Sequence, residues 1–314
     1  MPSLAVSEKA FLCPIIGSKM LKLGFIGAGT VGTALAVRLS RKGYLVVAVS
    51  SRSQTSARNL AQAVGGCPVF DNAQGVADIA ELIFITTPDG AIPTMAAQIH
   101  WHTGQSVLHC SGADSTGVLE PARKQGARVG VFHPLQTCAS VEQAIENIPG
   151  STFALEAEEP LLTILKDIAA ALDGHWVELK AGDKVLYHAA AVIACNYLVT
   201  LVKLASDLWQ TFSVPPDQAI QALLPLIRGT VHNIDAVGIP QCLTGPIARG
   251  DTGTIRKHLE ALEQRAPSVL PAYCELGLQT IPIALAKGRI DKDKARELQA
   301  ILTESKHQGG VQCE

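Results

Sequence analysis

The sequence has few charged and few aromatic side chains, and these shortages exclude several classes of partner. Charged residues make up 17% of the 314 residues, against about 25% in an average domain. The 26 Lys+Arg and 28 Asp+Glu give a formal net charge of −2, so no overall positive field holds nucleic acid. Aromatic residues, at 4%, are too few to build stacking platforms for single strands. The hydrophobic share of 47% excludes a disordered chain.

The eight cysteines lack the spacing of a metal site, because no two of them form a CxxC pair or a zinc-ligand pattern. We therefore expect no metal. The N-terminus has neither a basic start nor the long apolar stretch of a signal peptide. The cysteines are then expected to be reduced, mostly buried thiols of a cytoplasmic protein. Residues 1–19 are expected to be an extension, because a strand pattern begins directly after Met20.

Long apolar runs are also missing, since a membrane span needs about 18 consecutive apolar residues. The best candidate, Ala189 to Val202, has fourteen residues and contains Asn196 and Thr200. We expect it to be a deeply buried helix, in the domain core or between subunits, and we expect no membrane partner.

Two segments of different character make up the rest of the chain. Residues 20–180 alternate strand and helix patterns, which predicts a doubly wound α/β sheet of the Rossmann type. The expected strands are Lys22–Ile26, Tyr44–Val49, Leu82–Thr86, Ser106–His109, Arg128–Phe132, Thr152–Leu155 and Trp176–Leu179. Residues 181–305 show only helix patterns, at Asp183–Trp209, Pro216–Arg228, Thr254–Gln264 and Asp291–Thr303, which predicts an all-α second domain over residues 181–314.

A glycine-rich turn follows the first expected strand and opens a helix, the context that makes a GxGxxG motif specific. The motif comprises Gly27, Ala28, Gly29, Thr30, Val31 and Gly32. Its first glycine permits the tight turn, its second lets the backbone approach a pyrophosphate, and its third lets the helix pack on the strand. The free N–H groups of the helix start then face the anion. The alternative is a close-packed turn without a ligand.

The residues at the end of the second expected strand indicate which dinucleotide binds. An NAD site has an acidic residue there, whereas this chain has Ser51, Arg52 and Ser53. An arginine pairs with a 2′-phosphate that a carboxylate would repel. The pattern therefore favours NADP(H), the alternative for Arg52 being a solvated loop residue.

Polar side chains also follow the next strands, at the edge of the sheet where ligands bind. Thr87, Pro88 and Ser111 are expected to contact the cofactor, and His133 the substrate. Each of these loops has an alternative role in helix capping. A histidine such as His109 or His133, taken alone, is more often structural.

The helical segment opens with Lys184 and His188, four residues apart and on one helix face. Asn196 follows two turns later, about 80° round from His188. Together they offer the proton donor and hydrogen-bond donors that carbonyl reduction needs. The alternatives are a solvated Lys184 and a buried structural Asn196.

A polar loop, LTGPIARGD, follows at 243–251. Arg249 can pair with a substrate carboxylate, and Asp251 can instead cap the next helix or pair with Arg249.

These segments together resemble a known group of proteins over about residues 20–305. The segments GFIGAGTVG, SSRS, HCSGA, FHPLQ, YHAAAVIACNYLV and LTGPIARGD are similar to those of bacterial Rossmann-like proteins with a helical C-terminal domain of unassigned function. The group resembles a branch of the 6-phosphogluconate dehydrogenase-like oxidoreductases, relatives of ketopantoate reductase, 3-hydroxyisobutyrate dehydrogenase and pyrroline-5-carboxylate reductase.

The resemblance implies roles for several residues. In the hydroxyacid branch a Lys and an Asn that open the helical domain serve catalysis, which points to Lys184, His188 and Asn196. The Lys-to-Asn spacing is longer here, and His188 stands where a lysine is expected, so the donor is His188 or Lys184. The loop at 243–251 resembles a substrate-contacting Ser/Thr loop, which implicates Thr244. Such helical domains pair into homodimers.

The resulting hypothesis is an NADPH-dependent reductase of a small carbonyl compound bearing a carboxylate, such as a ketopantoate-like 2-oxo acid. Two alternatives stay open. One is an imine reductase resembling pyrroline-5-carboxylate reductase, and the other is a non-catalytic NADP(H)-binding redox sensor.

Overall fold

The computed structural model describes residues 15–16 and 19–309. The chain forms two compact units that divide between Cys195 and Asn196. Most of the expected extension lies outside the described residues. Its described part, β1 (Ile15–Ile16) and the start of β2 (Lys19–Met20), forms a short antiparallel pair.

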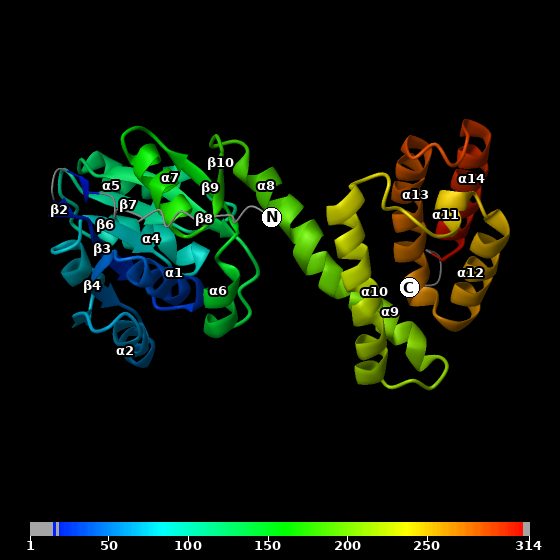
Figure 1. Ribbon diagram of the computed structural model, residues 1–314, viewed down its shortest axis with the longest axis horizontal. Coiled ribbons are helices and arrows are strands. Elements are labelled where there is room, and N and C mark those ends of the chain that lie inside the picture. Colours follow the sequence, from blue (N-terminus) through cyan, green and yellow to red (C-terminus); the bar gives the residue numbers. More distant parts are fainter. Residues whose placement is uncertain (1–14, 17–18, 310–314) are drawn as a thin grey trace, which may run out of the picture. The chain divides into compact units, whose positions relative to one another are not determined.

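The first unit is built on an eight-stranded sheet (Figure 1) with the order β10-β9-β8-β7-β6-β3-β4-β5. All neighbouring pairs are parallel except β8 and β9, which are antiparallel. The strands are β3 (Lys22–Ile26), β4 (Leu45–Ser50), β5 (Val69–Phe70), β6 (Leu82–Ile85), β7 (Ser106–His109), β8 (Arg128–Leu135), β9 (Thr152–Ala157) and β10 (His175–Glu178). The doubly wound sheet is confirmed, with one reversal of strand direction that the sequence did not indicate.

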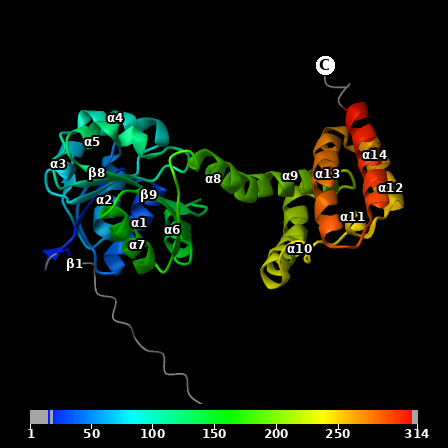
Figure 2. The same ribbon diagram turned by 90° about the horizontal axis from the view of Figure 1, so that it is seen from above.

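Helices cover both faces of the sheet (Figure 2). One face carries α1 (Thr30–Arg41), α2 (Gln54–Ala63), α6 (Val141–Asn147) and α7 (Leu161–Ala171). The other carries α3 (Ala73–Ala77), α4 (Ile92–Gln98) and α5 (Glu120–Lys124), with the 3₁₀ turns η1 (Asp89–Ala91) and η2 (Thr116–Leu119). Because both faces are buried, the inner strands are continuous apolar runs such as the LIFI of β6.

A row of phenylalanines ties the strands together. Phe25 stacks on Phe84 with ring centroids 5.0 Å apart, Phe84 meets Phe132 edge-on, and Phe132 stacks on Phe153 at 4.6 Å. The row crosses β3, β6, β8 and β9 in the buried core. It fixes the relative positions of strands whose carboxyl ends carry the candidate site.

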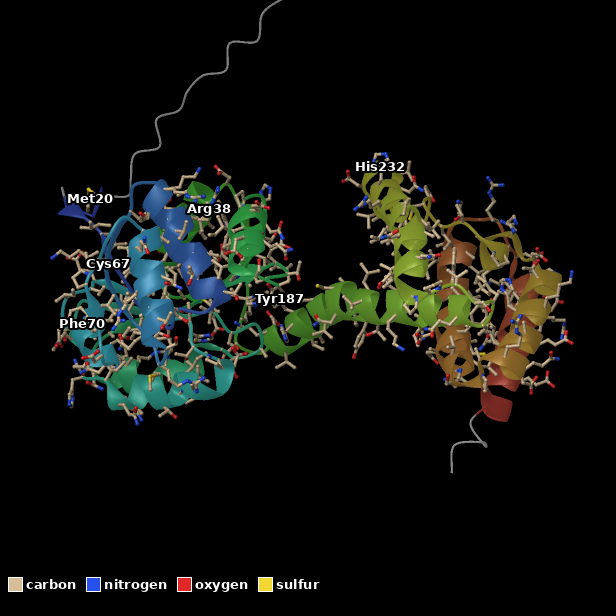
Figure 3. All side chains as sticks on the ribbon, turned by 90° about the horizontal axis from the view of Figure 1, so that it is seen from below. Met20, Arg38, Cys67, Phe70, Tyr187 and His232 are labelled. Carbon is tan, nitrogen blue, oxygen red and sulfur yellow. The ribbon has the colours of Figure 1, made fainter. Side chains whose placement is uncertain are left out.

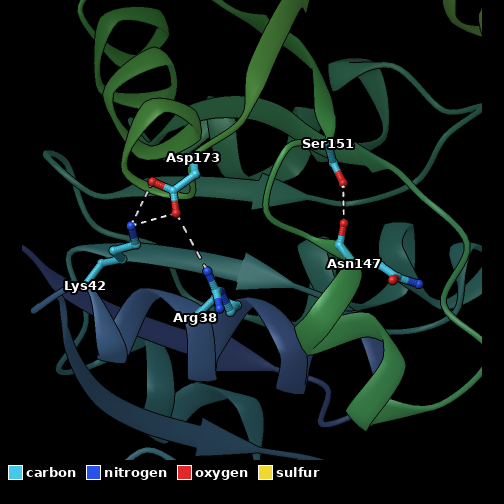
Figure 4. A network of polar contacts seen from close by, with 5 residues as sticks. All are labelled: Arg38, Lys42, Asn147, Ser151 and Asp173. Carbon is cyan, nitrogen blue, oxygen red and sulfur yellow. Dashed lines mark hydrogen bonds and ion pairs between the residues drawn. The ribbon is translucent and has the colours of Figure 1, made fainter. Parts of the chain in front are cut away.

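A surface ion-pair cluster fastens α1 to the turn between α7 and β10 (Figure 4). The Asp173 carboxylate accepts hydrogen bonds from Lys42 Nζ at 2.9 and 2.8 Å, and Arg38 lies 3.8 Å away. Close by, the Ser151 hydroxyl donates to the carbonyl oxygen of Asn147 at 2.8 Å. Because the ion pairs are partly exposed, each stabilises the fold by less than about 1 kcal/mol.

The second unit is helical. Its elements are α9 (Tyr197–Gln210), α10 (Pro216–Val237), α11 (Pro246–Arg249), α12 (Thr252–Arg265), η4 (Pro267–Val269), α13 (Leu270–Ala286) and α14 (Lys292–Gly309). Side chains of α12, α13 and α14, among them Leu259, Cys274 and Leu298, form its core. The sequence predicted neither α11 nor α13.

The division into units falls later than the expected boundary at residue 180, inside a continuous helical segment. That segment consists of α8 (Lys184–Ala191), a π-helical turn η3 (Val192–Asn196) and α9. The division moves because side chains of α8 contact the sheet, as described below.

The apolar stretch Ala189–Val202 is not buried by its own chain, which corrects the expectation of a deeply buried helix. Ile193 is 64% exposed and Val199 70%. By length and composition, the segments Lys184–Gln210 and Pro267–Ala286 are apolar enough to cross a membrane, although two such segments are weak evidence for a span.

The cysteines also depart from expectation. The six within the described residues are free, but only Cys274 is buried and Cys195 is exposed. Cys13 and Cys313 lie outside the described residues.

Candidate active site

A cavity of about 560 Å³ opens at the carboxyl ends of β3, β4 and β6. Parallel strands end at one edge of a sheet, which is where open α/β folds bind ligands. The cavity is lined by Ile26, Gly27, Ala28, Gly29, Ser50, Ser51, Arg52, Ser53, Ser56, Asp71, Asn72, Ala73, Thr86, Thr87, Pro88, Ala91 and Met95. Most of the predicted cofactor-contacting residues are therefore brought together, and Thr30, Val31 and Gly32 follow as the first turn of α1.

Two of the three glycines in the turn are required by close packing against Thr86. Gly27 has φ +110°, and a Cβ there would lie 2.7 Å from the carbonyl of Thr86. At Gly32 a Cβ would meet the Thr86 hydroxyl oxygen, which itself donates to the Gly27 carbonyl at 2.7 Å. A Cβ at Gly29 would meet nothing within 4 Å. The first and third glycines are thus required by packing, and the second faces open space.

The cavity suits the diphosphate and ribose groups of a dinucleotide. No side chain caps the start of α1, where Gly29 is the N-cap and no acidic residue lies in the first turn, so its N–H groups are available to an anion. The Thr87 hydroxyl is buried and has no hydrogen-bond partner among the described residues. Arg52 is exposed at the cavity.

Two further features of this cavity qualify the sequence prediction. Ser53 caps α2, its hydroxyl accepting from the Ser56 N–H at 3.2 Å, so it serves at least a structural role. Asp71 and Asn72 line the cavity without having been predicted. They follow β5, whose two residues are too few to show a strand pattern.

A second cluster lies beyond the end of β7, in the loop His109–Asp114. The hydroxyl of Ser111 is used inside this loop, because it lies 2.9 Å from Asp89 Oδ2 and 3.0 Å from Asp114 Oδ2 and also accepts from the Asp114 N–H. The loop is therefore tightly ordered. A cofactor contact by Ser111 stays a prediction, and its hydroxyl already forms hydrogen bonds with Asp89 and Asp114.

Lys184 reaches into this loop from the first turn of α8. Its side chain is 1% exposed, and its Nζ donates to the Ser111 carbonyl oxygen at 2.6 Å. Burial lowers the pKa of Lys184 to about 8, against the opposing effect of Glu156, Cys110, Asp114 and Asp89. The side chain is thus buried and held by a hydrogen bond, with a pKa closer to neutral than that of an exposed lysine, and it is not the solvated helix-start residue that was the alternative.

Two imidazoles meet over Gly112. Register pairs His109 with Val131, so His133, two residues on, lies on the same face of the sheet beyond the end of β7. A Cβ on Gly112 would lie 3.0 Å from His133 Nε2 and would clash with His188 Nδ1. The His188 Nδ1 atom is buried and has no hydrogen-bond partner among the described residues. His133 and His188, predicted from separate segments, therefore face one spot.

Tyr187 joins this group although sequence reasoning did not select it. It lies on α8 (Figure 3), and its hydroxyl is 2.9 Å from His133 Nδ1. Burial raises the pKa of Tyr187 to about 12. Burial, with the charges of Lys184, His188 and His109, lowers the pKa of His133 to about 4. At neutral pH this pair is therefore a phenol beside a neutral imidazole.

His109 and Cys110 have structural surroundings. His109 is fully buried, with Nε2 3.1 Å from the Ser115 carbonyl oxygen and Nδ1 accepting from the Ser111 N–H. Burial lowers the pKa of His109 to about 4 and raises that of Cys110 to about 12. Both ring nitrogens of His109 are therefore bonded within the loop, and at neutral pH the imidazole is neutral and the Cys110 thiol is protonated.

The remaining predicted residues belong to the second unit. Asn196 ends the π-helical turn and is exposed, as are Thr244 and Arg249. Asp251 caps α12, accepting from the Thr254 N–H at 3.0 Å and hydroxyl at 2.7 Å. Its capping role is settled, and the catalytic and substrate contacts of the other three stay predictions.

Comparison with known families matches both units. Residues 13–134 match the model of the Rossmann-like domain, and residues 151–280 match a domain of unknown function, DUF2520. The first part of the chain is thus similar to Rossmann-like domains, and the later part is similar to DUF2520 domains. The resemblance expected from the sequence motifs is confirmed.

Individual relatives agree with this assignment. The chain is 34% identical over 191 residues to 2-(hydroxymethyl)glutarate dehydrogenase of Eubacterium barkeri, a match that covers 57% of this chain and 60% of that protein. A candidate NADP oxidoreductase of Bacteroides fragilis is 24% identical, with 92% of this chain and 98% of that one covered and a TM-score of 0.63. The reductive aminase of Aspergillus terreus, solved with NADPH and ethyl-5-oxohexanoate, is 16% identical, with 93% and 95% covered and a TM-score of 0.59. The two solved structures share the fold.

Proposed function

We propose that this protein is an NADPH-dependent reductase of a small carbonyl compound that bears a carboxylate, with a ketopantoate-like 2-oxo acid as the leading substrate. The observation that carries the proposal is the buried Lys184 ammonium, held on the Ser111 carbonyl at the sheet edge that also forms the cavity. The dehydrogenase of Eubacterium barkeri supports it, because its named compound is a hydroxymethyl dicarboxylate. The NADPH and keto ester of the reductive aminase point the same way.

The cavity residues would hold the dinucleotide. The N–H groups of Thr30, Val31 and Gly32 at the start of α1 would bind the diphosphate. Arg52, with Ser51 and Ser53, would bind a 2′-phosphate, and the free hydroxyl of Thr87 would bond nearby. The bound NADPH would supply a hydride, two electrons and a proton nucleus, to the carbonyl carbon.

The carbonyl oxygen gains negative charge as the carbon is reduced, so it must receive a proton. Lys184 carries one that it can release, because burial has brought its pKa to about 8. His188 faces the same spot over Gly112 and would orient the oxygen or share the transfer. Asn196 would add a hydrogen bond, and Arg249 and Thr244 would hold the substrate carboxylate.

The test is steady-state NADPH oxidation with a panel of 2-oxo acids, aldehydes and cyclic imines. We expect turnover on a carboxylate-bearing carbonyl compound and a loss of about 10²–10⁴-fold in Lys184→Met, the usual range for a general acid. His188→Ala should lose activity as well, and wild-type turnover in that variant would remove His188 from the mechanism. Tight NADPH binding with no turnover on any compound would point instead to the redox-sensor alternative.

The variant Lys184→Met also distinguishes a carbonyl reductase from an imine reductase. A protonated imine already carries its proton and needs only the hydride, whereas a ketone also needs an acid. Lys184→Met should therefore abolish ketone reduction and spare reduction of a protonated cyclic imine. An enzyme that reduces only imines, with little effect of Lys184→Met, would be an imine reductase.

We also propose that the protein is a cytoplasmic homodimer joined through its long helices. The exposed apolar residues Ile193 and Val199, and on α10 Leu226 and Val231, are 55–70% exposed, an arrangement that a second copy would cover. Light scattering should give twice the chain mass for the wild type and for the control Gln210→Glu. Val199→Glu should shift the mass toward the monomer, and a wild-type monomer would refute the dimer.

A further inference from the structure

The Tyr187–His133 pair joins two segments 54 residues apart with one hydrogen bond. The hydroxyl of Tyr187 lies 2.9 Å from His133 Nδ1, and the two rings meet edge-on with centroids 5.6 Å apart. Among the described residues, His133 is the hydrogen-bond partner of this hydroxyl. The direction of that one hydrogen bond decides which nitrogen of His133 carries the proton.

We propose that Tyr187 is a positioning residue, which donates to His133 Nδ1 and so holds His133 as the Nε2–H tautomer, a neutral hydrogen-bond donor to the substrate oxygen. The inference rests on the proposed carbonyl reduction for its function. Its structural half, the tautomer, stands independently of any substrate.

The donor direction follows from the chemistry of the two groups. A phenol is a good hydrogen-bond donor and a poor acceptor, while the unprotonated nitrogen of imidazole is a strong acceptor. If His133 donated through Nδ1, the Tyr187 proton would have no acceptor among the described residues. The arrangement in which Tyr187 donates therefore satisfies both groups, and it leaves the imidazole proton on Nε2.

The charge state agrees with this arrangement. Burial, together with Lys184, His188 and His109, keeps His133 neutral at neutral pH, and burial keeps Tyr187 protonated. Neither group then competes with Lys184 as the source of the transferred proton. A neutral imidazole can still stabilise a developing oxyanion by hydrogen bonding alone.

The position of His133 Nε2 shows where this hydrogen-bond donor would meet a substrate oxygen. This nitrogen has no hydrogen-bond partner among the described residues and lies 3.0 Å from where a Gly112 Cβ would stand. The loop beneath it accepts the Lys184 ammonium through the Ser111 carbonyl. An oxygen bound over Gly112 would thus meet a hydrogen-bond donor in His133 beside the acid in Lys184.

The first experiment reads the tautomer directly. In protein labelled with ¹⁵N in its histidine rings, the NMR shifts of the two His133 nitrogens distinguish N–H from bare nitrogen, and His133→Gln assigns the signals. The wild type should show a proton on Nε2 alone. Tyr187→Phe should show a mixture of tautomers or a shift of the proton to Nδ1. A wild-type proton on Nδ1 would overturn the inference, whether or not a substrate has been found.

The second experiment measures the effect of the Tyr187 hydroxyl on catalysis. Tyr187→Phe keeps the ring and removes the hydroxyl, so kcat should fall about 10–100-fold, as when the partner of a functional histidine is lost, with the Kd for NADPH unchanged. The matched control is Tyr273→Phe, because Tyr273 bonds His258 Nδ1 at 2.8 Å in the same edge-on geometry within the second unit. The control should leave kcat unchanged. An altered tautomer with unchanged kcat would show that His133 does not contact the reacting oxygen.

Discussion

The Lys184 ammonium donates to the carbonyl oxygen of Ser111 at 2.6 Å, across 73 residues of sequence and with the lysine almost completely buried. This contact ties the first helix after the sheet to the loop after β7. It places a proton source among the polar groups at one edge of the sheet. The glycine turn and its cavity lie at the same edge.

The pH dependence of catalysis should follow Lys184. Its pKa of about 8 means that kcat/KM for a carbonyl substrate falls as pH rises through that value, because the ammonium loses the proton it must give. Lys184→Arg keeps the charge but cannot release a proton, so substrate binding should survive and turnover should not. Lys180→Met, an exposed lysine four residues earlier, is the control and should keep both activity and pH profile.

Arg52 should set the choice between cofactors. Loss of charge-assisted hydrogen bonds, each worth about 1.5–3 kcal/mol, should raise the Kd for NADPH about 10–100-fold in Arg52→Ala and leave that for NADH unchanged. Arg58→Ala, on an exposed position of α2, should change neither. Fluorescence titration with the two nucleotides measures both, and an unchanged NADPH/NADH ratio would remove Arg52 from the cofactor site.

Gly112 should tolerate no side chain. The Cβ of Gly112→Ala would clash with His188 Nδ1, so His188 must move, and kcat should drop at least about tenfold while NADPH binding persists. Gly253→Ala meets only an ordinary contact at 3.6 Å and serves as the control. Wild-type kcat in Gly112→Ala would show that the position of His188 is unimportant for the reaction.

Acid should destabilise the fold through His109. Its pKa is about 4 in the fold and 6.5 ordinarily, so between these values the unfolded chain binds more protons and the free energy of unfolding falls as pH falls. The full effect is about 3 kcal/mol. His109→Gln cannot titrate and should lose less stability between pH 7 and 4.5, as measured by urea unfolding. Equal losses in both proteins would contradict the buried neutral state.

Much of the sheet could be predicted because its inner strands are short, continuous apolar runs. β3 and β7 end where the sequence indicated, and β8 continues three residues further, since His133 and its neighbours pair with β9. Periodicity carries no information on strand direction, so the antiparallel pairing of β8 with β9 was not foreseen. Two-residue β5 was too short to detect, and α13 contains Pro282, which obscures a helix pattern.

The residues of the candidate site could also be predicted only in part. The glycine turn is local, so spacing alone identified it. Lys184 and His188 were found because they share a helix face. Tyr187 was not, because its value depends on His133, far away in sequence, and no periodicity connects the two. The burial that shifts the pKa of Lys184 likewise comes from the tertiary fold.

The unit that contains the glycine turn, Lys184, Tyr187 and His188 ends within the π-helical turn Val192–Asn196. The side chains that manage protons are therefore anchored in the same folding unit as the dinucleotide cavity. Sequence beyond Asn196 is free to diversify, through insertions or altered loops such as 243–251, without dismantling that assembly. Changes of substrate in evolution or by engineering are then expected to concentrate in the helical unit.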